Sequence, residues 1–240
     1  MKEDKSVVAS TSEEEIVIVP TVEIPDEEKI VHSDEATVST RFKDIYREFT
    51  PNQITDFRVN GQLFTFGCEN GVTLRVEVMT DKIIRFRYAH NGRFERDFSY
   101  AVDPKFTAKN VPVGLHVTTD FYEIKTAEVQ CKINKNNLGV QLLDKNGAVM
   151  LEDAAGFYAY WTILEGVSEV KMSKKAQAGE QFFGLGDKSC DQNMHGKQFE
   201  NWCTDSFAYG KDTDPLYRAV PFYYGLHDKR AYGIFFDNTY

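Results

Sequence analysis

The feature that most constrains the fold is an alternation of apolar and polar residues with a period of two. Residues 72–78 read Val-Thr-Leu-Arg-Val-Glu-Val, residues 84–88 read Ile-Arg-Phe-Arg-Tyr, and residues 129–133 read Val-Gln-Cys-Lys-Ile. Successive side chains of an extended chain point to opposite faces, so each segment presents one face to a core and the other to water. This pattern is typical of antiparallel sheets.

Asn-Gly pairs separate such segments, at residues 60–61, 70–71, 91–92 and 146–147. Tight hairpin turns require a positive φ, which Asn and Gly adopt at low cost. Strands that recur every 8–12 residues or so with turns between them predict a sandwich or a barrel. No helical pattern intervenes, which disfavours a parallel α/β fold. We therefore expect an all-β fold, an antiparallel β-sandwich that comprises residues 41–240.

Residues 1–40 have a different composition. They hold eleven Asp or Glu and three Lys, whereas the remaining 26 acids and 25 bases nearly cancel. Low hydrophobicity with high net charge favours disorder, so we predict a mostly disordered, flexible acidic tail. Within it, Ile16-Val17-Ile18-Val19 is expected to dock as an edge strand that Pro20 stops.

A short amphipathic helix is predicted directly after the tail, because four apolar residues have helical spacing and Pro51 would end the helix. These residues are Phe42, Ile45, Tyr46 and Phe49.

Several classes of function are disfavoured by what the sequence lacks. The balanced body has no basic face to attract nucleic acid. No apolar run approaches the length of about 20 residues that spans a bilayer. The N-terminus has no secretory signal, which indicates a cytoplasmic protein, although a periplasmic chain whose signal had been removed would look the same. The four cysteines (68, 131, 190 and 203) have no zinc-ligand or disulfide-scaffold spacing and are expected to be reduced and mostly buried.

The chemistry of the chain is concentrated in residues 180–218, which are rich in Gly, Asp, Asn and aromatic residues and lack clean alternation. Sugars have apolar ring faces and polar edges, so aromatic platforms beside carboxylates suit a carbohydrate site. A packed surface loop would have a similar composition, and both interpretations stay open at this point. Asp212-Thr213-Asp214 has the first spacing of a calcium loop, but it lacks the Gly and the distal Glu, so we expect a surface turn and no bound metal or cofactor.

The order of short motifs in this stretch resembles glycoside hydrolase family 31, the α-glucosidase and α-xylosidase family. The similar segments are Gln181–Lys188 (QFFGLGDK), Trp202–Ser206 (WCTDS), Asp212–Tyr217 (DTDPLY) and Ala231–Asn238 (AYGIFFDN), and earlier Leu74–Val78 and Ile83–Tyr88. Each segment is moderately specific, whereas the collinear set, which covers residues 55–240, is strong.

The resemblance implies a galactose-mutarotase-like β-sandwich that packs on a (β/α)8 barrel, and this barrel would supply both catalytic Asp residues of a retaining mechanism. The barrel and the last strands of the sandwich would come after residue 240, so we expect the chain to be part of a longer polypeptide, inactive alone. Its contribution would be to the subsite for the leaving-group sugar of an α-linked oligosaccharide. By motif position, Asp205 would bind that sugar, with Trp202 and Thr204 as neighbours. The family commonly has Asn where this chain has Cys203.

Two other classes of function remain as alternatives. A stand-alone carbohydrate-binding module would bind oligosaccharide without a barrel. An interaction domain would bind a partner through the acidic tail. The sandwich face that a barrel normally covers is expected to be apolar, so the chain alone is predicted to self-associate.

Overall fold

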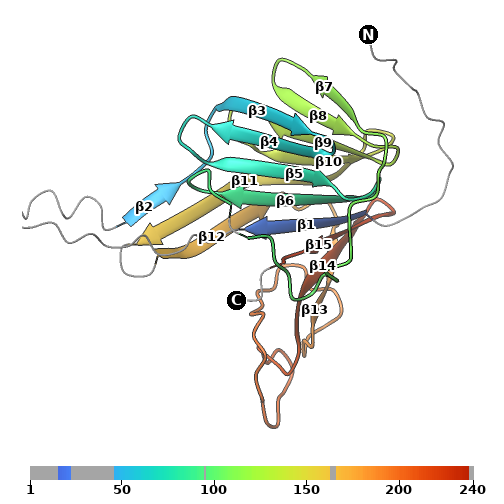
Figure 1. Cartoon of the computed structure of the whole chain (residues 1–240). Coiled ribbons are helices and arrows are strands. Elements are labelled where there is room, and N and C mark those ends of the chain that lie inside the picture. Colours follow the sequence, from blue (N-terminus) through green and yellow to red (C-terminus); the bar gives the residue numbers. More distant parts are fainter. Residues whose placement is uncertain (1–15, 23–45, 95, 163–165, 238–240) are drawn as a thin grey trace, which may run out of the picture.

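The computed structural model describes residues 16–22, 46–94, 96–162 and 166–237. This part of the chain contains fifteen strands and no helix, and so no helix that could cross a membrane (Figure 1). The strands are β1 (Ile16–Val22), β2 (Tyr46–Phe49), β3 (Ile54–Asn60), β4 (Leu63–Cys68), β5 (Thr73–Val78), β6 (Ile83–Ala89), β7 (Gly114–Val117), β8 (Phe121–Lys125), β9 (Val129–Asn134), β10 (Val140–Asp144), β11 (Val149–Thr162), β12 (Gly166–Lys174), β13 (Gln181–Gly186), β14 (Ala219–His227) and β15 (Arg230–Phe235). The predicted all-β class is confirmed.

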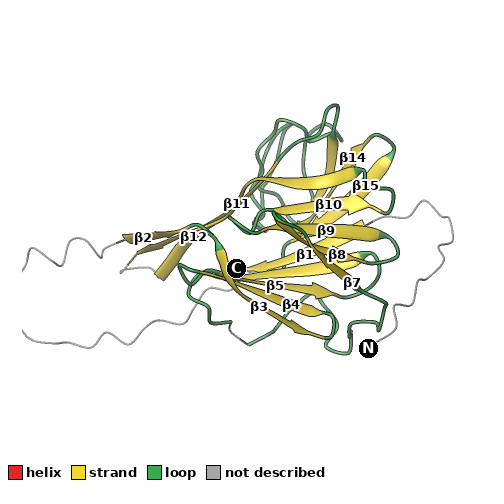
Figure 2. Ribbon diagram, turned by 90° about the horizontal axis from the view of Figure 1, so that it is seen from above, coloured by secondary structure: helices red, strands yellow, loops and turns green. Residues whose placement is uncertain are grey.

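The strands form two sheets that pack face to face (Figure 2). One has eight strands in the order β13-β14-β15-β1-β6-β5-β4-β3. The other has seven, in the order β12-β11-β10-β9-β8-β7, with β2 paired to β11. Except for β1, neighbouring strands run antiparallel. The predicted β-sandwich is confirmed.

The alternation in sequence becomes the core of the sandwich. Every second residue of β4 and β5 is buried, and the same period continues into β6 and β9. Tyr88 of β6 and Phe157 of β11 join the two sheets, with ring centroids 4.7 Å apart and ring planes 2° from parallel. Burying an aromatic side chain of this size contributes roughly 1.5–3 kcal/mol, so the two rings are major stabilising contacts between the layers.

Three of the four predicted Asn-Gly turns close hairpins. Gly61, Gly71 and Gly147 have positive φ values of 60°, 89° and 84° and join β3 to β4, β4 to β5, and β10 to β11. Gly92 also has a positive φ, 75°, but it ends β6, and the chain then crosses to the other sheet. Strands β14 and β15 form another hairpin, which turns at Asp228 and Lys229.

Two predictions near the N-terminus are wrong. Strand β1 is central rather than at an edge, because it pairs in parallel with both β6 and β15. It also continues through Pro20 to Val22. Pairing with β15 ends at Ile18, so Pro20 has only β6 as a neighbour, and a missing N–H is tolerated on the open side.

Residues 46–49 of the predicted helix form strand β2 instead. This strand pairs with the distal part of β11, from Thr162 to Ala159, and tertiary pairing overrides the helical spacing. Phe42 and Ile45 lie outside the described residues, as do residues 1–15 and 23–40 of the acidic tail. The disorder of that tail stays a prediction.

Candidate functional site

The candidate site lies on residues 187–218, here called the arm, which join β13 to β14. The arm projects from the sandwich below β13 and β14 in Figure 1. It contains bends and turns but no strand or helix, as the irregular composition of residues 180–218 predicted, although that range also includes strand β13. The shape of the arm therefore depends on individual side-chain contacts.

Two glycines and one ion pair form the base of the arm. Gly184 and Gly186 have φ values of 123° and 85°, and an added Cβ at either position would collide with the backbone of the neighbouring strand. Arg218 donates from Nε and Nη2 to both carboxylate oxygens of Asp187, at 2.9 Å each. This hydrogen-bonded pair lowers the pKa of Asp187. The two ends of the arm are thus held together.

A buried lysine organises the middle of the arm. The side chain of Lys188 is 2% exposed, and its Nζ donates to Asp214 Oδ1 at 2.6 Å and to the carbonyl of Glu200 at 2.7 Å. The other carboxylate oxygen of Asp214 accepts from the Glu200 backbone N–H at 2.5 Å. We call Lys188, Glu200 and Asp214 the clamp. Because Glu200 and Asp214 bracket residues 201–213, the clamp fixes both ends of that loop.

The loop between Glu200 and Asp214 carries all three predicted sugar-binding residues. Trp202 is 63% exposed and Asp205 is also exposed, whereas Thr204 is half-buried and its backbone N–H donates to the carbonyl of Leu216 at 2.9 Å. The loop thus presents an indole and a carboxylate to the surroundings. Cys203 is exposed as well, and its sulfur accepts a hydrogen bond from the Ala219 N–H at 3.4 Å.

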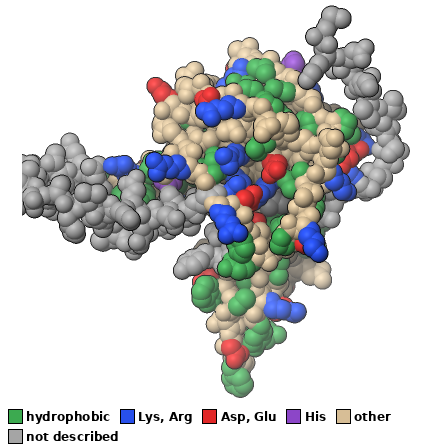
Figure 3. Space-filling model, viewed as in Figure 1, with side chains coloured by type: hydrophobic (Ala, Val, Ile, Leu, Met, Phe, Trp, Pro, Cys, Tyr) green, Lys and Arg blue, Asp and Glu red, His purple; other side chains and the backbone are tan. Residues whose placement is uncertain are grey.

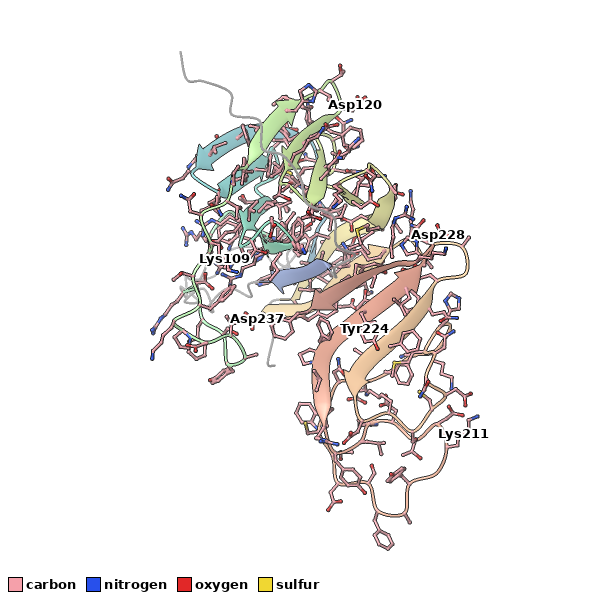
Figure 4. The ribbon with its side chains drawn as sticks, turned by 90° about the vertical axis from the view of Figure 1, so that its right-hand side faces the viewer. Lys109, Asp120, Lys211, Tyr224, Asp228 and Asp237 are labelled. Carbon is pink, nitrogen blue, oxygen red and sulfur yellow. The ribbon has the colours of Figure 1, made fainter. Side chains whose placement is uncertain are left out.

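Further aromatic side chains of the arm are exposed. Phe207 is 96% exposed, and Tyr209 and Tyr217 meet edge to face with ring centroids 5.9 Å apart. Hydrophobic side chains are visible along the arm in Figure 3, with charged residues between them. In the side view the arm, marked by Lys211, projects away from the sheet that contains Tyr224 (Figure 4). This surface combines ring faces with hydrogen-bonding groups, as sugar recognition requires.

Asp212 and Asp214, considered above as a calcium-like pair, have lysine partners. Asp212 pairs with Lys197 at 2.7 Å, and Asp214 belongs to the clamp. Among the described residues, no group of three or more His, Cys, Asp or Glu side chains has a geometry that would hold a metal ion. The surface turn predicted here is thus held by two lysine–carboxylate contacts.

Comparison with known proteins identifies the domain. Residues 73–240 match the family described as the glycosyl hydrolase 31 N-terminal galactose mutarotase-like domain. The chain belongs to this family. It is 26% identical over 179 residues to alpha-glucosidase 2 of Bacillus thermoamyloliquefaciens. It is also similar to the GH31 dextranase of Flavobacterium johnsoniae, solved in complex with isomaltotriose, with 31% identity and a TM-score of 0.67.

The GH31 N-terminal domain is a small part of these proteins. The alignments cover 74% and 80% of this chain, but 22% of the glucosidase and 23% of the dextranase. A cycloalternan-forming enzyme from Listeria monocytogenes, 16% identical with a TM-score of 0.64, shares the fold. The structural match covers 75% of this chain and 17% of the Listeria enzyme.

A recess elsewhere in the GH31 N-terminal domain contains two acids. It has a volume of about 290 Å³ on the outer face of β4–β6 and includes Glu77 and Asp97. Both acids face Arg85: Asp97 makes a bidentate pair with it, and Glu77 lies 3.8 Å away. The hydrogen bond from Arg85 lowers the pKa of Asp97, which is the opposite of what a general acid needs. We assign this recess a structural role.

Sequence reasoning missed the clamp and the arginine recess. Arg75 and Arg87 face each other across β5 and β6, and alternating arginines in both strands were the available signal for the recess. Lys188 is the last residue of the motif segment Gln181–Lys188, which was the available signal, but the motif does not indicate that this lysine is buried. Of the cysteines, Cys68 and Cys131 are buried as predicted, Cys190 is half-buried and Cys203 is exposed.

Proposed function

We propose that this domain belongs to a retaining α-glycosidase of the α-glucosidase type, which hydrolyses α-linked glucosides. Its role is to support a (β/α)8 barrel and to complete the subsite for the leaving-group sugar. The acids that cleave the bond lie on the barrel, and the 240-residue chain alone is inactive. The observation that carries this proposal is the clamped loop, which presents Trp202 and Asp205 to the surroundings.

The names of the relatives support the type of substrate. One is an alpha-glucosidase, and the dextranase was solved with isomaltotriose, an α-linked glucose oligomer. The electrostatics of the arm suit binding better than proton transfer, because Asp187 and Asp212 are ion-paired and their pKa values are lowered by hydrogen bonds from Arg218 and Lys197. Ionised carboxylates accept hydrogen bonds but do not act as acids.

In this proposal Asp205 accepts hydrogen bonds from sugar hydroxyls, and the Trp202 indole packs on an apolar sugar face. A hydrogen bond to a charged group contributes about 1.5–3 kcal/mol. Thr204 holds the loop through its backbone bond to Leu216 and lies between the two contact residues.

The first experiment separates the domain from catalysis. Purified residues 1–240 are expected to release no product from an aryl α-glucoside above background. Clear turnover by this chain would overturn the proposal, because it would put the catalytic acids in the domain.

The second experiment uses the polypeptide that joins this domain to its barrel. Asp205→Asn is expected to lower kcat/KM for isomaltotriose by about 10- to 100-fold, equivalent to one charged hydrogen bond. Asp191→Asn is the matched control, because Asp191 is an exposed arm carboxylate that pairs with Lys211. Equal effects of the two substitutions on kcat/KM would show that Asp205 does not bind sugar in this subsite.

The exposed arm also favours a second candidate, a stand-alone carbohydrate-binding module. Calorimetric titration of residues 1–240 with millimolar isomaltotriose tests it. Binding that Trp202→Ala abolishes would support this candidate, and the absence of heat would count against it.

A further inference from the structure

A second aromatic surface lies far from the arm. Strand β2 and the distal parts of β11 and β12 form a three-stranded extension that projects beyond the sandwich (Figure 1, Figure 2). On its inner side, Phe157 packs on Tyr88, and Trp161 packs against the core. The alternate residues therefore face outward. We call the outward set the tyrosine face: Tyr46, Glu48, Tyr158, Tyr160, Thr162, Glu169 and Lys171.

The composition of this face differs from that of the outer face of the other sheet. Three of its seven outward residues are tyrosines. The outward positions of β4–β6 include four charged residues and two threonines but no aromatic residue; they are Leu63, Thr65, Gly67, Thr73, Arg75, Glu77, Ile83, Arg85, Arg87 and Ala89. Outward positions of a half-covered sheet are usually polar, and the tyrosine face does not contribute to the core. A contribution to the core therefore does not account for the tyrosines.

The side chains of the face are ordered relative to one another. The rings of Tyr46 and Tyr160 lie 6.0 Å apart with 25° between their planes, and Tyr46 is 57% exposed. Beside them, burial and the nearby Glu48 carboxylate raise the pKa of Tyr158. Pre-ordered side chains lose little conformational entropy when a ligand binds.

A lysine and a second carboxylate complete the polar part of the face. Lys171 Nζ lies 5.5 Å from the centroid of the Tyr158 ring and 2.8 Å from Glu169. The face thus offers ring surfaces, carboxylate acceptors and an ammonium donor side by side. With two acids and one base, the face has no net positive charge that would attract nucleic acid or an anionic membrane.

We propose that the tyrosine face is a second carbohydrate-binding surface, and that its ligand is an α-glucan chain. Tyr46 and Tyr160 pack against sugar ring faces, while Glu48, Glu169 and Lys171 bind hydroxyl groups at the ring edges. The choice of an α-glucan rests on the function proposed above, whereas the assignment to carbohydrate rests on the face itself.

The two surfaces act on different parts of a polymer. The extension and the arm project from different sides of the sandwich in Figure 1. A polymer held at the tyrosine face remains close to the arm, which raises the effective concentration of its other segments there. The face therefore favours polymeric over short substrates.

Affinity electrophoresis of residues 1–240 in gels that contain dextran or soluble starch tests the proposal. The unchanged chain is expected to be retarded by at least one of the polymers. Tyr46→Ala combined with Tyr160→Val is expected to weaken the apparent affinity at least five-fold. Tyr100→Ala, at a tyrosine that is 78% exposed on another surface, is the matched control and should migrate like the unchanged chain. Thermal melting confirms that each variant is folded, and Tyr46→Ala alone, at an edge strand, serves if the double variant does not fold.

Three results would overturn the proposal. The first is the absence of retardation in both polymers. The second is retardation that survives both tyrosine substitutions but is lost in Trp202→Ala, which would assign polymer binding to the arm. The third is a change in self-association, with unchanged retardation, when Tyr46 is replaced, which would make the face a contact between copies of the chain. Failure of the proposed enzymatic function has a different signature: tyrosine-dependent retardation would persist while the polypeptide that includes the barrel did not hydrolyse α-glucosides.

Discussion

The sandwich and the arm achieve a defined shape in opposite ways. In the sandwich, backbone ladders pair the strands, and apolar side chains such as Phe66, Leu74 and Ile133 are fully buried between the sheets. The arm has no ladder of its own, and its segments are joined by polar contacts centred on Lys188 and Asp214. A domain can therefore obtain stability from one region and present ligand-binding groups on another, because an apolar core and an exposed polar surface satisfy different requirements.

The largest expected loss of stability tests whether the apolar core holds the sandwich together. Phe157→Ala removes a ring that is 2% exposed and stacks on Tyr88 across the two sheets. We expect the free energy of unfolding to fall by about 3–5 kcal/mol, as measured by urea denaturation. Phe207→Ala, at an arm residue that is 96% exposed, should change it by less than about 0.5 kcal/mol. Similar losses of unfolding free energy for the two variants would show that buried apolar contacts do not stabilise the sandwich more than exposed side chains stabilise the arm.

Lys188→Met tests whether polar contacts hold the arm together. This change leaves the partly buried Asp214 carboxylate without its cation and removes the bond to Glu200. We expect the free energy of unfolding to fall by about 1.5–3 kcal/mol, the range for hydrogen bonds to charged groups. Hydrogen exchange should accelerate in residues 199–216 and remain slow in β5 and β6. Exchange that accelerates equally in the sandwich would show that the arm is not an independent unit. Lys197→Met is the control, because its partner Asp212 is more exposed.

Sequence could predict the sandwich because a two-residue period reports directly which side chains are buried. It did not place β1, since the pattern of Ile16–Val19 identifies a strand but not its neighbours, and parallel partners far along the chain leave no local signal. It also failed at Tyr46 and Phe49, whose spacing suits a helix until pairing with β11 is known.

For the arm, composition and motif order indicated Trp202 and Asp205 as sugar-binding residues. Both are exposed, and their role stays a prediction. The clamp could not be predicted, because a contact among residues 188, 200 and 214 depends on the path of the backbone and not on any periodic pattern.

A smaller loss of stability is expected from a substitution at the junction of the sandwich and the arm. Gly186→Ala places a methyl group against the Arg218 carbonyl at a φ of 85°. Gly196→Ala, within the arm, has a similar φ of 75° but meets no atom within 4 Å. Both variants bear the cost of a left-handed residue, about 1–2 kcal/mol, and only Gly186→Ala adds a backbone collision. The difference between their melting temperatures measures how tightly the arm is joined to β14. Equal melting temperatures would indicate that the junction adapts without cost.

The smallest effect concerns the charged outer face of the sandwich, and it depends on pH. The pKa of Asp97 is lowered mainly by its hydrogen bond with Arg85, so the folded state binds a proton at this group less readily than the unfolded state. Its contribution to stability is therefore present above the unfolded pKa of about 3.9 and disappears as the pH falls through the lower folded value. Because the Asp97 side chain is 51% exposed and screened by solvent, Asp97→Asn should cost less than about 1 kcal/mol at pH 7. Urea denaturation at pH 7 and pH 3 should show this difference shrinking at the lower pH. A difference that grows on acidification would show that the pair between Arg85 and Asp97 does not stabilise the sandwich.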